Sequence, residues 1–425
     1  MDSTGQVAPP APAAGGGGWR RLSPGHTFAA LRHRNYRLFF CGQFISLVGT
    51  WMQNVAQAWL VYALTNSPFK LGVVSFCAGV PVLLFALWAG VVADRMPKRR
   101  LLMMTQTGMM TLAFLLAADV FFGTVAWWHI AVLAFLLGVA NAFDAPARQA
   151  FVVEMVGRAE LMNAIALNSA MFNSARIIGP ALAGVTLASL GAQWCFVLNG
   201  ASFLAVIAGL ALMDVQPYVG APAGGSPLAQ MREGISYVWR HPTVRPLITV
   251  VAVSNLFSFG YLALLPAFAQ DVLRVGSVGY GFMSTAVGVG ALAGALVMAT
   301  LGDYPGKGRM LTAGNLLFPA MVIAVALSRS FHLTLGCLVL AGLGFMTQNA
   351  TANTLVQTTV PDGLRGRAMS VYMMVFLGFF PIGALIAGTV AERWGAPAGA
   401  AFGGLVGLAY GLYLLWRHPG IRALR

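Results

Sequence analysis

Apolar runs separated by short polar or charged segments dominate this chain from about residue 38 onward. Each run is close to the ~20 residues that an α-helix needs to cross ~30 Å of hydrocarbon. In lipid the backbone must satisfy its hydrogen bonds within its own segment, so we expect helices rather than open strands. The pattern predicts an all-α integral membrane protein with twelve transmembrane helices, at 38–64, 71–93, 101–122, 126–147, 163–188, 193–213, 245–270, 277–300, 309–328, 331–357, 369–391 and 397–416.

The composition agrees with a chain surrounded by lipid. Hydrophobic residues make up 58% of the chain and charged residues 9%, against ~25% charged in soluble domains. The net charge of +14 would indicate a nucleic-acid partner in a soluble protein. Here 21 of the 26 lysines and arginines fall on the side of the two termini, four fall in the opposite loops, and Arg176 lies inside a span. The positive-inside rule therefore places both termini in the cytoplasm, and we expect no nucleic-acid partner.

Part of the first half of the chain returns in the second half. At a shift of 209 residues, ADRMPKRRLL at 93–102 returns as GDYPGKGRML at 302–311. At a shift of 204 residues, GPALAG at 179–184 meets GALIAG at 383–388. Equivalent loops lie on the same side, so the repeat predicts two six-helix bundles in the same orientation, at 30–213 and 243–416.

Three segments lie outside these bundles. Residues 1–29 begin with a Pro/Ala/Gly-rich stretch and are expected to be a disordered cytoplasmic arm, and they lack the features of a signal peptide. In the linker 214–242, Ser226 is a suitable N-cap and Pro227 a suitable first helical residue. A short amphipathic helix on the cytoplasmic membrane surface is predicted there, and a simple tether is the alternative; its apolar stripe is Leu228, Met231, Ile235 and Val238. Residues 417–425 form a cytoplasmic tail.

The chain contains no clear catalytic cluster. Its six histidines are scattered over segment ends and loops, and its four cysteines lie in apolar spans at unrelated spacings. A membrane-embedded enzyme would need acids, histidines or cysteines at ligand spacing, so this class is a remote alternative. Neither a metal nor another cofactor is expected.

The loop GVVADRMPKRR at 90–100, its weaker copy and the central linker resemble the major facilitator superfamily, apart from Pro97 where glycine is usual. The stretches RNYRLFFCGQFISLVGTWMQNVAQAWLVYALTNSPFKLG, DAPARQAFVVEMVGRAELMNAIALNSA and ARIIGPALAG resemble its branch of bacterial enterobactin exporters and macrolide efflux proteins. This resemblance implies a monomer in the bacterial plasma (inner) membrane, with substrate handled between two bundles. It implies a proton-coupled exporter of a small amphipathic molecule, siderophore or drug-like, working by alternating access. An importer or a lysolipid flippase of the same fold stays open.

The same resemblance implies that the loop acts as a latch. Its residues here are Gly90, Asp94 and Arg95, and the carboxylate of Asp94 would contact Arg148 and the helix that starts near Met369. Such a latch would stabilise the state that is closed on the cytoplasmic side, because arginine forks and helix N-termini both stabilise a carboxylate. The alternative is that the basic residues of the loop only set topology.

Asp144 and Arg176 lie deep within the predicted spans, where a charge costs roughly 2.5–3.5 kcal/mol on insertion scales. Asp144 and Arg176 are similarly distant from the turn near 157–160, so at 1.5 Å per residue they lie at similar depth. We expect them to face each other or a shared water-filled cavity, with Asn141 and Asn173 on the same helix faces. They either bind substrate or a proton, with Asp144 as the best proton carrier, or form a structural ion pair.

Polar residues also recur at helical spacing within two spans. Both stripes either line a cavity or form interhelical hydrogen bonds; they are Gln43, Ser46, Thr50, Asn54 and Gln57 in the first, and Asn349, Asn353 and Gln357 in the second. ARIIGPALAG resembles a motif associated with antiporters of the superfamily, which it matches at Gly179, Pro180 and Gly184 but not at Ala175 and Ala183. Its small residues predict close helix packing.

Overall fold

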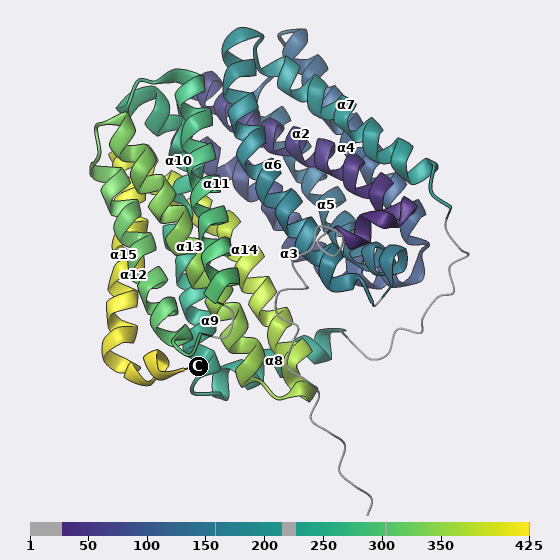
Figure 1. The fold of residues 1–425 in the computed structure, drawn as a ribbon. Helices are drawn as coiled ribbons and strands as arrows, with labels where there is room; N and C mark the ends of the chain where they lie inside the picture. The colour runs from purple at the N-terminus through teal and green to yellow at the C-terminus, as the bar shows by residue number, and fades with distance from the viewer. Residues whose placement is uncertain (1–27, 158, 215–226, 302–303, 425) are drawn as a thin grey trace, which may run out of the picture.

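The structure is a computed structural model that describes residues 28–157, 159–214, 227–301 and 304–424. Every regular element among these residues is a helix. In Figure 1 the long helices form two bundles side by side, the first coloured purple to teal and the second green to yellow. The helices of the first bundle are inclined to those of the second, and α8 lies at the bottom of the view, below the second bundle.

The first bundle consists of six long helices after a short 3-10 turn. Several helices extend beyond the predicted spans, because the chain stays helical past the charged residues at the ends of the apolar runs. The bounds are η2 (Ala29–Arg32), α2 (Arg34–Thr65), α3 (Pro68–Arg95), α4 (Lys98–Phe121), α5 (Trp127–Val156), α6 (Leu161–Ser189) and α7 (Ala192–Ala211).

The linker helix α8 (Pro227–Arg240) leads into the second bundle. The first rod of this bundle runs over 244–272 and contains two π-helical turns, η3 and η4. The bounds are α9 (Val244–Val253), η3 (Ser254–Ser258), α10 (Tyr261–Ala267), η4 (Phe268–Val272), α11 (Gly276–Leu301), α12 (Lys307–Leu327), α13 (Phe331–Thr359), α14 (Asp362–Trp394), α15 (Ala396–Arg417) and η5 (Pro419–Ala423).

Long helices occupy all twelve predicted places, but among the described residues ten are both long and apolar enough to cross a membrane. The other two are α2 and α6, the predicted first and fifth spans. Both are long enough, with 32 and 29 residues, but neither contains a continuous stretch that is apolar enough. Gln43, Gln53 and Asn173 on these helices are buried within the protein, so their polarity faces protein rather than lipid.

We call the end of the molecule that holds the start of α2 and the end of α15 the terminal side, and the opposite end the far side. On the terminal side, basic residues of the loop after α3 link the ends of three helices. Lys98 at the start of α4 is buried and forms an ion pair of 3.2 Å with Glu154 of α5. Arg99 donates to the carbonyl oxygen of Ala211 at the end of α7 over 2.8 Å. These two residues therefore contribute packing contacts as well as positive charge.

Small residues bring the two bundles together. A Cβ added at Gly72 would lie 2.7 Å from the carbonyl oxygen of Ala384, where α3 meets α14. A Cβ added at Gly281 of α11 would lie 2.7 Å from the carbonyl oxygen of Pro180 and 2.8 Å from the Cα of Gly184, both on α6. Helices can approach this closely only where side chains are absent.

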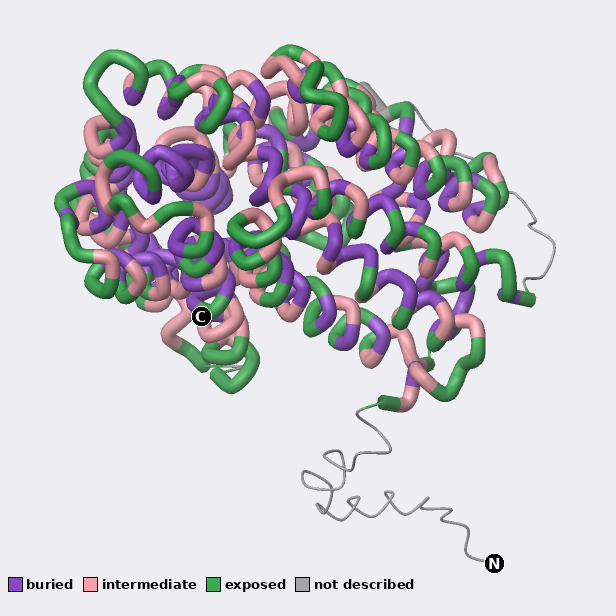
Figure 2. The backbone as a smooth tube through the Cα atoms, turned by 90° about the horizontal axis from the view of Figure 1, so that it is seen from above, coloured by how far each residue is buried: buried purple, intermediate pink, exposed green. Residues whose placement is uncertain are grey.

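The apolar cores show where the bundles are joined. One core includes residues of both bundles, among them Val55 of α2, Leu264 of α10 and Tyr280 of α11. On the terminal side each bundle has a core of its own, around Phe151 in the first and Tyr372 in the second. Figure 2 shows the buried residues inside the bundles and exposed residues around the outside. The described bundles are therefore joined through their far-side halves.

The linker helix α8 packs on α14 through Gly234 and through only part of the predicted stripe. Gly234 lies against α14, where an added Cβ would be 2.6 Å from the carbonyl oxygen of Arg367, and Val238 beside it is buried. Ile235 of the predicted stripe is exposed. The predicted N-cap Ser226 and most of the arm 1–29 lie outside the described residues. The absence of a side chain at Gly234 allows this close docking, which hydrophobic spacing alone did not predict.

Replacing Gly281 with alanine should lower the thermal unfolding midpoint of the purified protein. The new methyl group would meet the backbone of α6, which cannot rotate away. The matched control is Gly336→Ala on α13, where an added Cβ meets nothing within 4 Å. That substitution should raise stability by roughly 0.5–1 kcal/mol, because alanine is the better helix former. Equal midpoints for the two variants would contradict the close α6–α11 contact.

Candidate functional site

Two acidic residues of the second bundle hold the far side of the first. The hydroxyl of Tyr62 in α2 donates a hydrogen bond to the carboxylate of Asp271 in η4. The carboxylate of Glu392 in α14 accepts from the hydroxyl of Ser67 over 2.8 Å and from the N–H of Phe69 over 3.0 Å. The first N–H groups of a helix have no partner within the helix, so Glu392 caps α3 from the other bundle.

The contact between α6 and α11 ends at Arg176. The hydroxyl of Thr285 donates to the carbonyl oxygen of Ile177 over 3.2 Å, and a Cβ added at Gly288 would lie 3.0 Å from the carbonyl oxygen of Arg176. All hydrogen bonds between the two bundles, within the part of the chain that the structure describes, lie at this level or farther toward the far side. Arg176 therefore marks the inner end of the hydrogen-bonded contact between the bundles.

The side chain of Arg176 lies between residues of both bundles. Its guanidinium carbon is 5.7 Å from the ring centroid of Trp51 in α2, and its charge interacts with Tyr261 in α10. The ring of Tyr261 is 1% exposed and its buried hydroxyl has no hydrogen-bond partner. Among the described residues Arg176 has no hydrogen-bond or ion-pair partner either. The hydroxyl of Tyr261 and the guanidinium of Arg176, which come from different bundles, thus both lack a hydrogen-bond partner among the described residues.

Asp144 is the most deeply buried charged group of the first bundle, with 2% of its side chain exposed. Its Oδ1 accepts hydrogen bonds from the hydroxyl of Thr105 and the amide of Gln106, each over 2.9 Å. Its Oδ2 lies 3.4 Å from Nε of Arg148, one turn along the same helix. The carboxylate therefore joins α4 to α5 and has a cationic partner on its own helix.

Of the two arrangements expected for Asp144 and Arg176, the direct pairing is not formed in this conformation. The two residues lie at a similar depth along their helices, but depth does not determine the direction in which each helix presents its side chain. Asp144 faces α4, whereas Arg176 faces α2 and α10. Asn141 and Asn173, expected beside them, each donate to a carbonyl of their own helix, over 3.0 and 2.9 Å.

A hollow of about 270 Å³ lies beside Arg148. Residues of α2, α5 and α6 line it, and its polar lining includes Arg148, Gln149 and Asn168. Arg148 is partly exposed, with 28% of its side chain accessible, while Asp144 behind it is buried. The guanidinium of Arg148 therefore separates the carboxylate from the hollow.

The latch expected from the loop is not formed in this conformation. Asp94 and Arg95 are exposed, and Asp94 has no hydrogen-bond or ion-pair partner among the described residues. Arg148, its expected partner, pairs with Asp144 instead. An added Cβ at Gly90 would meet nothing within 4 Å. The reason is the separation of the bundles on the terminal side, where the loop and the start of α14 belong to different cores.

The polar stripes differ in how they are satisfied. On α2, Gln43 and Gln57 are buried, and the side-chain oxygen of Gln43 has no partner. Asn54 is exposed. Viewed down the helix axis, however, it points away from the exposed Ile45 and lies on the same face as the buried glutamines. On α13 the amide of Gln357 donates to Asn353. Within the antiporter-like motif, a Cβ added at Gly179 would lie 2.5 Å from that of Trp51.

Aromatic side chains gather in the second bundle next to Tyr261. The rings of Phe259 and Phe345 stack with centroids 4.0 Å apart, and Phe380 meets Phe259 edge-on at 5.3 Å. Phe318 lies 6.3 Å from both Tyr261 and Phe259. The first bundle thus brings Arg176 to the contact between the bundles, and the second brings an aromatic cluster.

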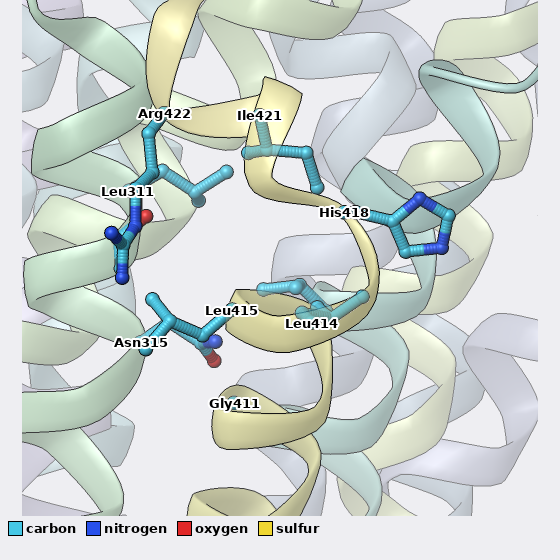
Figure 3. A pocket seen from close by; sticks show the side chains of 10 residues that line it. Leu311, Asn315, Gly411, Leu414, Leu415, His418, Ile421 and Arg422 are labelled. Atoms are coloured by element: carbon cyan, nitrogen blue, oxygen red, sulfur yellow. The ribbon is translucent and has the colours of Figure 1, made fainter.

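A smaller gap lies between α12, α15 and η5, shown in Figure 3 with Asn315, His418 and Arg422 among its lining residues. Its volume is about 20 Å³, which is room for about one water molecule. It is too small for a substrate. Among the described residues no group of three or more histidine, cysteine or acidic side chains could hold a metal ion.

The sequence analysis missed several residues at the contact between the bundles. Tyr261 and Trp51 lie in apolar runs, where an aromatic residue resembles any other core residue. Thr105 and Gln106 carry no charge that would single them out. Asp271 and Glu392 were available as acidic residues near span ends, but their partners lie more than 200 residues away in sequence.

The sequence matches the family described as transmembrane secretion effectors over residues 25–419. It is 28% identical over 361 residues to the staphyloferrin A transporter of Staphylococcus aureus (strain NCTC 8325 / PS 47), covering 84% of this chain and 90% of that protein. It is 29% identical to the multidrug efflux pump Tap of Mycolicibacterium fortuitum, with 81% and 86% covered. It is 24% identical to the enterobactin exporter EntS of Shigella flexneri, with 90% and 91% covered.

The fold is shared with solved transporter structures. A bacterial homologue of the human lysosomal transporter Spinster, solved in an inward-facing and unoccupied conformation, superposes with a TM-score of 0.67 at 13% identity. The superposition covers 94% of this chain and 97% of that structure. These relatives and this structural neighbour are transporters rather than enzymes.

Replacing Glu392 with alanine should open the far side more often. The substitution removes the acceptor of two hydrogen bonds between the bundles, and bonds to a charged group contribute about 1.5–3 kcal/mol each. A cysteine at Asn54, in a protein whose own four cysteines are replaced by serine, reports the opening. We expect an impermeant thiol reagent applied from the far side to label it at least about tenfold faster.

The matched control is Asp119→Ala. Asp119 is also acidic and near the far side, but it bonds to Thr124 and His129 within the first bundle. Its loss should leave the labelling rate unchanged. Equal rates in the Glu392 variant and the parent protein would show that this carboxylate does not hold the bundles together.

Proposed function

The chain belongs to the transmembrane secretion effector family of the major facilitator superfamily, and from this premise we propose a proton-coupled exporter working by alternating access. Its substrate is a small amphipathic molecule, siderophore-like or drug-like. The relatives named above include two siderophore transporters and a multidrug efflux pump, which supports this substrate class. We place the protein as a monomer in the plasma (inner) membrane of a bacterium.

One observation carries the proposal: the hydrogen bonds between the described bundles all lie toward the far side. The hydrogen bonds of Asp271 and Glu392 and the shared apolar core lie there, while each bundle keeps its own core on the terminal side. The excess of lysine and arginine on the terminal side supports a cytoplasmic location for that side. Substrate then enters from the cytoplasm in the conformation described.

The opposite conformation is expected to exchange one set of contacts for another. Closing the terminal side would bring Asp94 toward Arg148 and toward Met369, which lies two turns inside α14 because this helix begins at Asp362 rather than near Met369. To join this latch Arg148 must leave Asp144. Formation of the latch would therefore remove the cationic partner of the buried Asp144 carboxylate. A ligand can shift such a balance only through its different affinity for the two states.

Asp144 is the group that we assign to proton coupling. It lies within the membrane-spanning part of α5, and its partner Arg148 borders the hollow through which a proton would arrive. In the second bundle, the described charged residues lie near helix ends. Buried carboxylates inside spans mark proton relays in many transporters. The competing role is structural, because the same carboxylate bonds Thr105 and Gln106 of α4.

Transport by everted vesicles tests direction and coupling together. Vesicles given a proton gradient, acidic inside, should accumulate a fluorescent drug-like dye if the protein is an exporter. Uptake in intact cells, with none in everted vesicles, would indicate an importer instead. A headgroup-labelled lysolipid added in parallel distinguishes a flippase.

The variant Asp144→Asn should insert and fold but lose gradient-driven accumulation, because the amide cannot release a proton. The control is Glu154→Gln, which removes an acidic group of the same helix that bonds Lys98 near the terminal side. It should retain most of the activity. Normal accumulation by the Asp144→Asn protein would assign the carboxylate to structure alone.

The latch gives a second prediction. Cysteines at Asp94 and Met369, in a protein without its own cysteines, should react poorly with a short bifunctional thiol reagent in the conformation described. Adding Glu392→Ala should raise the yield of cross-linked protein several-fold, since losing a charge-assisted contact favours the opposite state. The same pair with Asp119→Ala is the control. A high yield in the absence of the Glu392 change would contradict the separation of the terminal sides.

A further inference from the structure

We propose that Arg176 and Tyr261 form a binding site for the anionic group of the substrate, at the inner end of the contact between the bundles. The ligand class is an anion, carboxylate or phosphate, attached to an apolar or aromatic body. This inference rests on the proposed function and deepens it, because it names the charge of the transported molecule.

The first observation is the missing partner of Arg176. An arginine inside a membrane span is costly and normally pairs with an acid or with backbone carbonyls. Among the described residues Arg176 has no such partner; its guanidinium lies 5.7 Å from the ring centroid of Trp51. The acid at similar depth, Asp144, is occupied by Thr105, Gln106 and Arg148.

The second, independent observation is the hydroxyl of Tyr261. It is fully buried without a hydrogen-bond partner, although a buried polar group left unpaired costs about 1–3 kcal/mol. Its ring packs near Phe318 in the second bundle, and its hydroxyl interacts with the charge of Arg176 from the first. One acceptor with negative charge would satisfy both groups.

The charges inside the spans support an anion rather than a cation. Asp144 and Arg148 neutralise each other, so Arg176 contributes the net charge of about +1 in the middle of the described helices. A cationic ligand would be repelled there. An anion would gain charge-assisted hydrogen bonds from a guanidinium, which binds carboxylate and phosphate through two parallel bonds.

The aromatic neighbours indicate the rest of the ligand. Phe259, stacked on Phe345 and met by Phe380, lies two residues from Tyr261 and is only partly buried. Trp51 lies on the opposite bundle beside Arg176. Rings on both sides of the charged group favour a ligand with a flat, apolar body next to its anion.

Equilibrium binding to the purified protein in lipid nanodiscs tests the inference without any gradient. The probes are 1-naphthoate, its neutral amide 1-naphthamide, and the anionic lysolipid lysophosphatidylglycerol, with empty nanodiscs subtracted. The native protein should bind at least one anionic probe about tenfold or more tighter than the neutral amide. Arg176→Gln should abolish that preference, and Tyr261→Phe should weaken anion binding by roughly three- to tenfold.

The control is Arg245→Gln. Arg245 also lies over a tryptophan, 4.7 Å from the ring centroid of Trp239, but at the start of α9 on the terminal side. Its loss should leave the preference for the anion unchanged. A preference for naphthoate identifies a free carboxylate as the ligand, and a preference for the lysolipid alone identifies a lipid headgroup.

Equal binding of anions and amide by the native protein, or an unchanged preference in Arg176→Gln, would overturn the proposal. If that variant does not fold, the anion preference is measured in Arg176→Lys and Tyr261→Phe instead. Lysine keeps the charge but loses the fork, so the preference should fall in both, and an unchanged preference in both refutes the site. An anion preference that depends on Arg176, in a protein that accumulates nothing in everted vesicles, would instead refute export.

Discussion

A charge inside hydrocarbon must find a partner or water, and Asp144, Arg148 and Arg176 meet this constraint differently. Asp144 is enclosed by two neutral donors and by Arg148. Arg148 itself reaches the hollow in the first bundle. Arg176 has an aromatic ring beside it and an unpaired hydroxyl near it. The first two form a closed unit within one bundle, whereas the third depends on the other bundle.

Close backbone contact determines where the two bundles can touch. Gly72, Gly184 and Gly281 let α3 meet α14 and α6 meet α11 at distances that no side chain would allow. The contacts of Asp271 and Glu392 then add hydrogen bonds at the same end of the molecule. The glycine contacts and the hydrogen bonds lie on the same side of the molecule. The bundles can therefore separate on that side only if both sets of contacts break together.

The fold could be predicted largely from sequence, because long apolar runs specify helices and the repeated loop specifies two similar halves. The family was also predictable, since its motifs are local in the chain. The site was predicted less well. Depth along a helix follows from residue counts, but direction depends on which helices become neighbours, so the sequence could not decide whether Asp144 pairs with Arg176. Glu392 meets the N–H of Phe69 from a distant part of the chain, and no local pattern predicts such a contact.

The two π-helical turns in the rod over 244–272 have a geometric consequence. Phe259 donates to the carbonyl oxygen of Ser254, and Leu273 to that of Phe268, five residues back in each case. Each such turn holds one residue more than an α-turn, which rotates all later side chains by about 100°. Tyr261 lies between the two turns. An α-helical wheel drawn through the whole rod would therefore misplace it. A one-residue deletion in η3 would point the hydroxyl of Tyr261 in another direction without replacing any of the remaining side chains.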